Sequence, residues 1–260
     1  MSKPLVISHR GANVYAPQNT LPAFEMSLEI GVDGFETDVH VTKDGIPVIC
    51  HNYTVDETSD GKGEISSMTL EQLRELDFGG YFSPRYKGTK IPTVDEFLSL
   101  VEKTDLELMN IELKSPKQAE SNIVSLTINA VKEHGLFDKL LISSFDPKLL
   151  VEAKKIDSKC RTGFLYSPDK PLALKMFRQP VEFAKSIRAD ALHPYEYYVL
   201  KEDYVKQAHD AGILVNPWTV DSDKNIERMI FFGVDGIITN RPDVVNGLIY
   251  KHSIPEEEIE

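Results

Sequence analysis

The chain has 260 residues, of which 41% are apolar and 27% charged, a composition typical of a soluble globular protein. Its formal net charge of −12 at neutral pH offers no basic surface for a phosphate backbone, which argues against nucleic acid as a partner. The first residues lack the apolar core of a signal peptide and no stretch is long enough to span a membrane, so we expect a cytoplasmic protein without a transmembrane segment. The sequence makes no prediction of the oligomeric state.

Strand-like apolar runs alternate with helical patterns along the whole chain. The first helix is expected over residues 20–30, which Gly31 is placed to end. Another is expected over residues 93–103, where Thr93 and Glu96 have the spacing of a capping box. Eight strands are expected, at residues 5–8, 34–41, 106–113, 139–145, 161–166, 189–193, 213–218 and 234–239. This number of strand–helix units in about 250 residues predicts a TIM (β/α)8 barrel as one catalytic domain over residues 1–260.

The alternation alone also allows an open, doubly wound sheet. Two features favour a closed barrel. The first strand is followed by Ser8-His9-Arg10-Gly11 in place of a glycine-rich nucleotide-binding turn, and polar residues recur at the carboxyl ends of the strands. The region between residues 52 and 92 interrupts the alternation, and we interpret it as an insertion that lies over the carboxyl-terminal mouth of the barrel.

The second strand carries two carboxylates, Glu36 and Asp38, which share one face because strand side chains alternate. The dipeptide Asp44-Gly45 predicts a tight hairpin turn, and a two-residue turn there would place His51 opposite Asp38. A longer turn would shift this register by one residue. Taken alone, the two carboxylates would be better explained as a polar surface face of an amphipathic strand.

Other titratable residues fall at the ends of the neighbouring strands. His9 and Arg10 end the first strand, and Glu112 and Lys114 end the third. Together with the carboxylates of the second strand, Glu112 makes an oxygen-rich site that suits one divalent cation, Mg²⁺ or Ca²⁺, with Mn²⁺ as an alternative. Positive side chains and imidazoles beside such a site are what phosphoryl chemistry requires.

Two aromatic residues end later strands, Phe145 in the fourth and Trp218 in the seventh. They could form an apolar wall for a substrate, or they could fill the upper layer of the barrel interior.

An ordered series of short motifs runs along the chain. It consists of His9-Arg10-Gly11, Pro17-Gln18-Asn19-Thr20, Glu36-Thr37-Asp38-Val39, Thr42-Lys43-Asp44-Gly45, His51, Glu112-Leu113-Lys114, Ser143-Ser144-Phe145, Trp218-Thr219-Val220 and Asp235-Gly236-Ile237-Ile238-Thr239-Asn240-Arg241-Pro242. This series resembles the signature of the glycerophosphodiester phosphodiesterase family. The motifs cover nearly the whole chain.

The resemblance implies a TIM barrel that cleaves a small-molecule glycerophosphodiester to glycerol 3-phosphate and an alcohol, in lipid and glycerol metabolism. It further implies site residues. The cation is held by Glu36, Asp38 and Glu112, the acid–base pair is His9 with His51, and the phosphate is bound by Arg10 and Lys114. We expect His9 to act as the base and His51 as the acid.

The chain departs from the family signature at two positions, where Gln18 and Asn52 replace the usual glutamate and aspartate. These losses of charge leave open a second hypothesis, a barrel that binds glycerophosphodiesters without cleaving them. A metal-dependent hydrolase of the amidohydrolase type is disfavoured, since its first strand needs two histidines in a His-x-His pattern, whereas this chain has His9-Arg10.

Overall fold

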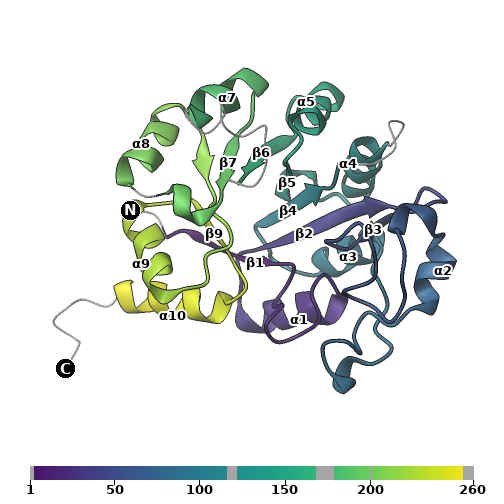
Figure 1. The fold of residues 1–260 in the computed structure, drawn as a ribbon. Coiled ribbons are helices and arrows are strands. Elements are labelled where there is room, and N and C mark those ends of the chain that lie inside the picture. Colours follow the sequence, from purple (N-terminus) through teal and green to yellow (C-terminus); the bar gives the residue numbers. More distant parts are fainter. Residues whose placement is uncertain (1–2, 116–121, 168–178, 200, 254–260) are drawn as a thin grey trace.

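The computed structural model describes residues 3–115, 122–167, 179–199 and 201–253, and its frame is a cylinder of parallel strands inside a ring of helices (Figure 1). The strands are β1 Leu5–His9, β2 Gly34–Val41, β3 Pro47–Ile49, β4 Leu108–Leu113, β5 Leu140–Ser144, β6 Arg161–Tyr166, β7 Ala191–Pro194, β8 Leu214–Val215 and β9 Gly236–Thr239. Their order in the sheet is β8-β7-β6-β5-β4-β2-β1-β9, and β3 pairs antiparallel with β2 as the return arm of a hairpin.

Backbone hydrogen bonds close the cylinder between β8 and β9. The amide of Asp235 donates to Val215 O at 3.0 Å, that of Ile238 donates to Pro217 O at 3.1 Å, and that of Val220 donates to Ile238 O at 2.9 Å. The predicted TIM barrel is therefore confirmed, and the open doubly wound sheet is excluded.

The helices follow the strands and cover the outside of the barrel, except α2, which belongs to the insertion (Figure 1). They are α1 Leu21–Ile30, α2 Leu70–Glu75, α3 Val94–Val101, α4 Ile123–Glu133, α5 Pro147–Ile156, α7 Pro180–Ile187, α8 Glu202–Asp210, α9 Asp223–Phe232 and α10 Pro242–Ser253. The expected helix ends are confirmed at Gly31, which caps α1 with a φ of 82°, and at Thr93 and Glu96, which form the capping box of α3.

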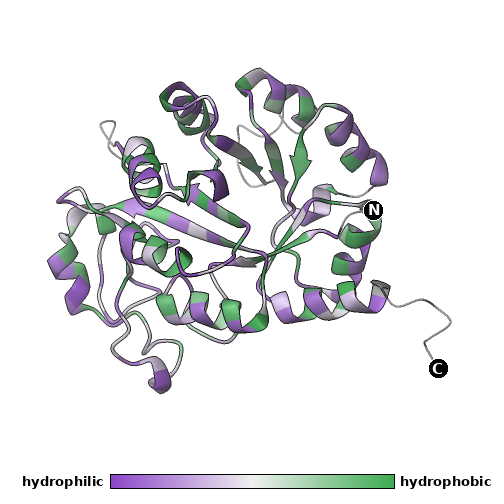
Figure 2. Ribbon diagram, turned by 180° about the vertical axis from the view of Figure 1, so that it is seen from behind, coloured by the Kyte–Doolittle hydropathy of each residue, from purple (hydrophilic) through white to green (hydrophobic). Residues whose placement is uncertain are grey.

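Along β2, alternate side chains point outward into the apolar core and inward into the barrel. Phe35 points outward and packs against Phe24 and Phe97 at ring-centroid distances of 5.2 and 5.9 Å, whereas Glu36 and Asp38 point into the barrel. The largest apolar cluster accordingly lies between strands and helices. In Figure 2 the outer helices carry polar and apolar residues on the same helix, as expected for helices that cover a core on one side.

The insertion only partly follows the expectation from the sequence. Of its residues, Asn52, Tyr53, Thr54 and Glu57 line the barrel mouth. The remainder, which includes α2, lies beside β3 at the edge of the molecule (Figure 1), and a small apolar core joins it to β3. Its members are Val48, Cys50, Val55, Ile65, Leu73, Phe78 and Ile91. The expected position over the mouth is therefore found for those four residues, whereas the apolar side chains of the rest are buried against one another at the side of the barrel.

Within the described part of the chain, no helix combines the length and the apolar character that crossing a bilayer requires.

Candidate active site

Three carboxylates meet inside the barrel at the carboxyl ends of β2 and β4. These parallel strands are in a register that places Asp38 directly opposite Glu112, while Glu36 lies one step lower, opposite Asn110. One oxygen from each of the three carboxylates lies within 4.8 Å of the others, and all three residues are buried. Strand alternation predicted that Glu36 and Asp38 share a face, and Glu112 was expected beside them at the end of a neighbouring strand. The geometry agrees with both expectations.

The ammonium group of Lys114 bridges two of these carboxylates. Its Nζ lies 2.7 Å from Asp38 Oδ1 and 2.6 Å from Glu112 Oε1, and Arg10 Nε lies 3.4 Å from Asp38 Oδ2. Although burial favours the neutral acid, the charges of Lys114 and Arg10 hold the pKa of Asp38 well below its usual value. Asp38 is therefore the fixed negative charge of the cluster.

The other two carboxyl groups resist ionisation. Burial, and then the negative charges of Asp38 and Glu112, raise the pKa of Glu36 well above its ordinary value. Burial also raises the pKa of Glu112 to about 7, against the opposing charge of Lys114. A divalent cation between the three carboxylates would offset the mutual repulsion that raises these pKa values.

The donor set fits such a cation. Two oxygens that bind one Ca²⁺ ion at about 2.4 Å lie at most about 5 Å apart, in line with the 4.8 Å limit that Glu36, Asp38 and Glu112 satisfy. Three hard carboxylate oxygens without a thiolate suit Mg²⁺, Ca²⁺ or Mn²⁺ better than Zn²⁺. The cluster can therefore hold one divalent cation, and its ligands do not select among the three ions.

Arg10 reaches the cluster because the chain turns sharply after β1. Arg10 and Gly11 have positive φ angles of 57° and 76°, and a Cβ atom on Gly11 would lie 2.7 Å from the backbone of Ala23. Only glycine fits at that position. The guanidinium donates a hydrogen bond from Nη1 to Gln18 Oε1 at 2.7 Å, so Gln18, one of the two departures from the family signature, holds Arg10 through a neutral oxygen.

His9 stands beside Glu36 at the end of β1, with its Nε2 3.8 Å from Glu36 Oε2. Its other nitrogen, Nδ1, lies 2.7 Å from Asn240 Oδ1, and the Asn240 amide nitrogen donates to Asp221 Oδ2 at 2.6 Å. Burial, followed by the charge of Arg10, lowers the pKa of His9 to about 3. The imidazole is therefore neutral at pH 7.

The hairpin register differs from the prediction by one residue. The observed ladder pairs Val39 with Ile49, so Asp38 lies opposite Cys50 rather than His51. The turn contains one residue more than the two-residue turn that Asp-Gly predicts, and the whole return arm is shifted.

His51 nevertheless lines the same cavity, for a different reason. The strand β3 ends at Ile49, and the chain then leaves the sheet, so the side-chain direction of His51 no longer follows strand alternation. His40 Nε2 donates to the carbonyl of His51 at 3.3 Å, and His51 Nδ1 lies 2.6 Å from Asn52 Oδ1. Burial lowers the pKa of His51 to about 4, although the charge of Asp38 opposes this shift.

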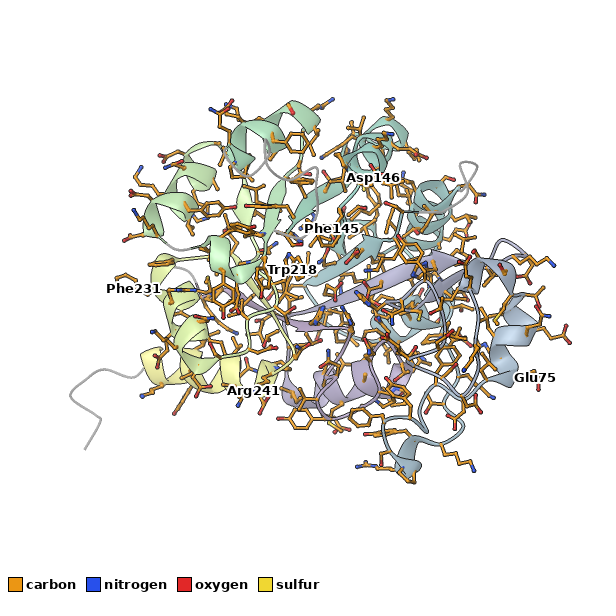
Figure 3. All side chains as sticks on the ribbon, in the orientation of Figure 1. Glu75, Phe145, Asp146, Trp218, Phe231 and Arg241 are labelled. Atoms are coloured by element: carbon orange, nitrogen blue, oxygen red, sulfur yellow. The ribbon has the colours of Figure 1, made fainter. Side chains whose placement is uncertain are left out.

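Aromatic side chains form one wall of the site. The ring of Trp218 lies edge-to-face with that of Phe145, at a centroid distance of 5.5 Å, and 5.7 Å from that of Tyr195. Figure 3 labels Phe145 and Trp218, which lie near each other inside the ring formed by the strands. Trp218 also donates from Nε1 to the carbonyl of His193 at 2.8 Å, which fixes the indole. Both predicted aromatic residues thus border the cavity.

The cavity at the mouth has a volume of about 1260 Å³. Among the predicted site residues, those on its lining are His9, Arg10, Glu36, His51, Glu112, Lys114, Phe145 and Trp218. Asp38 is not on the lining, since it lies fully buried beneath Lys114 and Arg10. The volume is ample for a small-molecule substrate.

Sequence reasoning missed the asparagines that hold these groups. Asn19 donates to Asp38 Oδ2 at 2.8 Å and accepts from Thr37 at 2.8 Å, and Asn240 contacts His9. Both asparagines stand in segments that resemble the family signature, which was the available signal. Their partners could not be predicted, because they lie 18, 19 and 231 residues away in the chain.

A closed parallel barrel with titratable groups converging at its carboxyl-terminal mouth defines an enzyme of the TIM-barrel class. A model described as the glycerophosphoryl diester phosphodiesterase family matches residues 9–244. The chain is 38% identical over 249 residues to a glycerophosphodiester phosphodiesterase from Caldanaerobacter subterraneus, covering 96% of this chain and 99% of that one. The chain belongs to the glycerophosphoryl diester phosphodiesterase family, and it is an enzyme that hydrolyses glycerophosphodiesters.

Solved structures agree with this assignment. A phosphodiesterase from Oleispira antarctica, determined in complex with the product sn-glycerol-3-phosphate, has a TM-score of 0.86 and 27% identity, with 95% of this chain and 97% of that chain covered. A glycerophosphodiester phosphodiesterase from Parabacteroides distasonis has a TM-score of 0.80 and 27% identity, with 97% and 99% covered.

Proposed function

We propose that the chain cleaves glycerophosphodiesters to sn-glycerol 3-phosphate and an alcohol with the help of one divalent cation and two histidines. The observation that carries the proposal is the cluster of Glu36, Asp38 and Glu112, within 4.8 Å of one another, in a cavity that His9 and His51 also line. The product is inferred by similarity to the Oleispira antarctica phosphodiesterase, whose structure was determined with sn-glycerol-3-phosphate.

The cation would be held by the three carboxylates, and when bound it supplies positive charge that neutralises the phosphodiester oxygens. Arg10 and Lys114 bind the same phosphate from the protein side. Gln18 supports the role of Arg10, because a neutral amide oxygen orients the guanidinium without neutralising it. These positive charges attract the negatively charged phosphodiester to the site, although the net charge of the protein is −12.

His9 acts as the base at its Nε2 atom. Its low pKa keeps that nitrogen unprotonated at neutral pH, so it can accept the proton of the attacking hydroxyl group. The attacking group is the 2-hydroxyl of the glycerol, so the first product is a cyclic phosphate that water opens in a second step.

His51 acts as the acid in its imidazolium form, in which Asn52 holds the Nδ1 proton and Nε2 donates its proton to the departing alkoxide. The negative charge of the bound phosphodiester favours this imidazolium and opposes the burial that lowers the pKa of His51 in the ligand-free protein. The two imidazoles exchange roles when the cyclic phosphate is opened. Phe145 and Trp218 supply the apolar wall against which the glycerol or the alcohol packs. The cytoplasmic location and the place in lipid and glycerol metabolism remain predictions from the sequence and the resemblance.

Replacing each histidine tests the acid–base pair. His9→Ala and His51→Ala should each lower kcat by about 10²–10⁴-fold, since that is the usual contribution of one general acid or base. Thermal unfolding should confirm that both variants fold. His134→Ala is the control, because this surface histidine pairs with Asp95 and Glu102 away from the cavity. Turnover by either active-site variant at the rate of the control would disprove the two-histidine mechanism.

A further inference from the structure

The Nδ1 atom of His51 is linked to a carboxylate through an amide at the rim of the cavity. His51 Nδ1 lies 2.6 Å from Asn52 Oδ1, and Asn52 Nδ2 donates to Glu57 Oε2 at 2.7 Å. A carboxylate only accepts hydrogen bonds, so the amide nitrogen of Asn52 must face Glu57 and its oxygen must face His51. His51 Nδ1 must then carry a proton, so the neutral imidazole has its lone pair on Nε2, and the additional proton of the imidazolium is carried by Nε2.

The second imidazole has the same arrangement, built from unrelated parts of the chain. His9 Nδ1 lies 2.7 Å from Asn240 Oδ1, and Asn240 Nδ2 donates to Asp221 Oδ2 at 2.6 Å. The order of groups, imidazole, amide oxygen, amide nitrogen and carboxylate, is identical. Two independent segments thus impose one tautomer on the two histidines of the cavity.

We propose that Glu57 is a positioning residue that acts through Asn52 to fix the tautomer of His51, an inference that rests on the proposed acid–base role of this histidine. Asn52 stands where the family signature has an aspartate, so the imidazole here contacts no carboxylate at that position. By accepting a hydrogen bond from the amide nitrogen of Asn52, the Glu57 carboxylate keeps the Asn52 oxygen facing His51 as a hydrogen-bond acceptor. Glu57 is exposed at the rim of the cavity, so its replacement leaves the apolar core intact.

Two variants of Glu57 separate hydrogen-bond polarity from charge. Glu57→Gln removes the charge but keeps an oxygen that can accept from Asn52. Glu57→Leu removes the acceptor, so the amide of Asn52 is free to turn its nitrogen toward His51. We expect Glu57→Leu to lower kcat by about tenfold or more, with KM changed by less than about threefold. Glu57→Gln should retain a kcat several times that of Glu57→Leu.

A second pair of variants inverts the donors and acceptors. Asn52→Asp alone sets two carboxylates against each other at the position of the 2.7 Å hydrogen bond, which is unfavourable. Adding Glu57→Gln supplies an amide nitrogen that can donate to the new carboxylate at position 52, while the other oxygen of that carboxylate accepts from His51. The double variant should therefore have a higher kcat than Asn52→Asp alone.

The ¹⁵N spectrum of the imidazoles reads the tautomer directly, without reference to turnover. His51 is assigned by the signals that disappear in His51→Ala. In the unaltered enzyme we expect His51 to be protonated at Nδ1 and unprotonated at Nε2, and in Glu57→Leu we expect the proton to redistribute toward Nε2.

An unchanged His51 spectrum and unchanged kcat in Glu57→Leu would overturn the inference, as would a double variant no more active than Asn52→Asp. Failure of the proposed function is a different result, namely full turnover by His51→Ala. In that case the ¹⁵N spectra of the Glu57 variants would still decide whether Glu57 sets the tautomer.

Discussion

Asp38 and Glu112 face each other across neighbouring parallel strands, and a single ammonium group, that of Lys114, contacts both carboxylates at 2.7 and 2.6 Å. With Glu36, three carboxyl groups share only Lys114 and Arg10 as cationic neighbours within the described residues. The site therefore holds an excess of negative charge when all three carboxyl groups are ionised. Burial is the main cause of the raised pKa values of Glu36 and Glu112, and repulsion among the carboxylates adds to it. The excess of negative charge is the physical basis of the expected cation site.

Removing one carboxylate should weaken cation binding. Saturating Mg²⁺, Ca²⁺ or Mn²⁺ should raise the melting temperature, because an ion at about one hundred times its Kd adds about 2.7 kcal/mol to the free energy of unfolding. Glu36→Gln should reduce this stabilisation at the same ion concentration. Glu25→Gln, an exposed site on α1, is the matched control. Equal stabilisation of both variants by the ion would place the cation elsewhere.

Cation affinity should increase with pH between about 5 and 8. The pKa of Glu112 is raised from 4.5 to about 7 in the folded protein, so the folded state binds a proton that the unfolded chain has lost. The stabilising contribution of that proton is complete below pH 4.5 and is lost as the pH rises through 7. Because the ion requires the ionised carboxylate, its binding should release protons. Calorimetric titration in buffers of different ionisation enthalpy measures this release, and an affinity independent of pH would contradict the assignment.

Lys114→Met should destabilise the ion-free protein. It leaves Asp38 and Glu112 facing each other without the ammonium group, and loss of one partner from a buried ion pair costs about 3–5 kcal/mol. Urea unfolding in the presence of a chelator measures the change. Lys206→Met, which removes an exposed pair with Asp210 on α8, should change stability little. A similarly small effect at both positions would show that the buried bridge does not stabilise the fold.

Gly163→Ala tests the packing of the barrel interior beneath the site. A Cβ atom there would lie 2.5 Å from Nε2 of the fully buried His193, so the substitution should cost about 1–3 kcal/mol. Gly247→Ala on α10 has no atom within 4 Å of the added carbon and should stabilise the protein by about 0.5–1 kcal/mol. Thermal unfolding of the two variants should therefore shift in opposite directions, and a stable Gly163→Ala would contradict the close contact.

A substrate without the 2-hydroxyl group tests the proposed order of bond changes. If that hydroxyl is the attacking group, the 2-deoxy analogue of a glycerophosphodiester should bind but should not be cleaved. Binding is measured by competition with the hydroxylated substrate, and cleavage by release of the alcohol. Turnover of the analogue would exclude the cyclic phosphate.

Local sequence patterns were sufficient to predict individual helices and strands and the strand face on which a side chain lies. Strand alternation placed Glu36 and Asp38 on one face. Capping residues predicted the C-terminus of α1 and the N-terminus of α3. The register of the hairpin could not be fixed in this way, since Asp-Gly fits both two-residue and three-residue turns. His51 reached the cavity only because β3 ends two residues before it.

Contacts between segments that are distant in the chain could not be predicted from the sequence. Asn240 meets His9 only because β9 closes the barrel against β1, and nothing local in either segment indicates the other. Lys114 was expected to bind phosphate, and its two ion pairs within the carboxylate cluster were not expected, because they depend on the register between β2 and β4.

Release of sn-glycerol 3-phosphate from a panel of glycerophosphodiesters, with and without a strong chelator, tests the central claim most directly. We predict turnover of at least one member that stops when the chelator is present and returns when Mg²⁺, Ca²⁺ or Mn²⁺ is restored. Turnover that continues at full rate in the chelator, with the metal content confirmed as zero, would contradict the account.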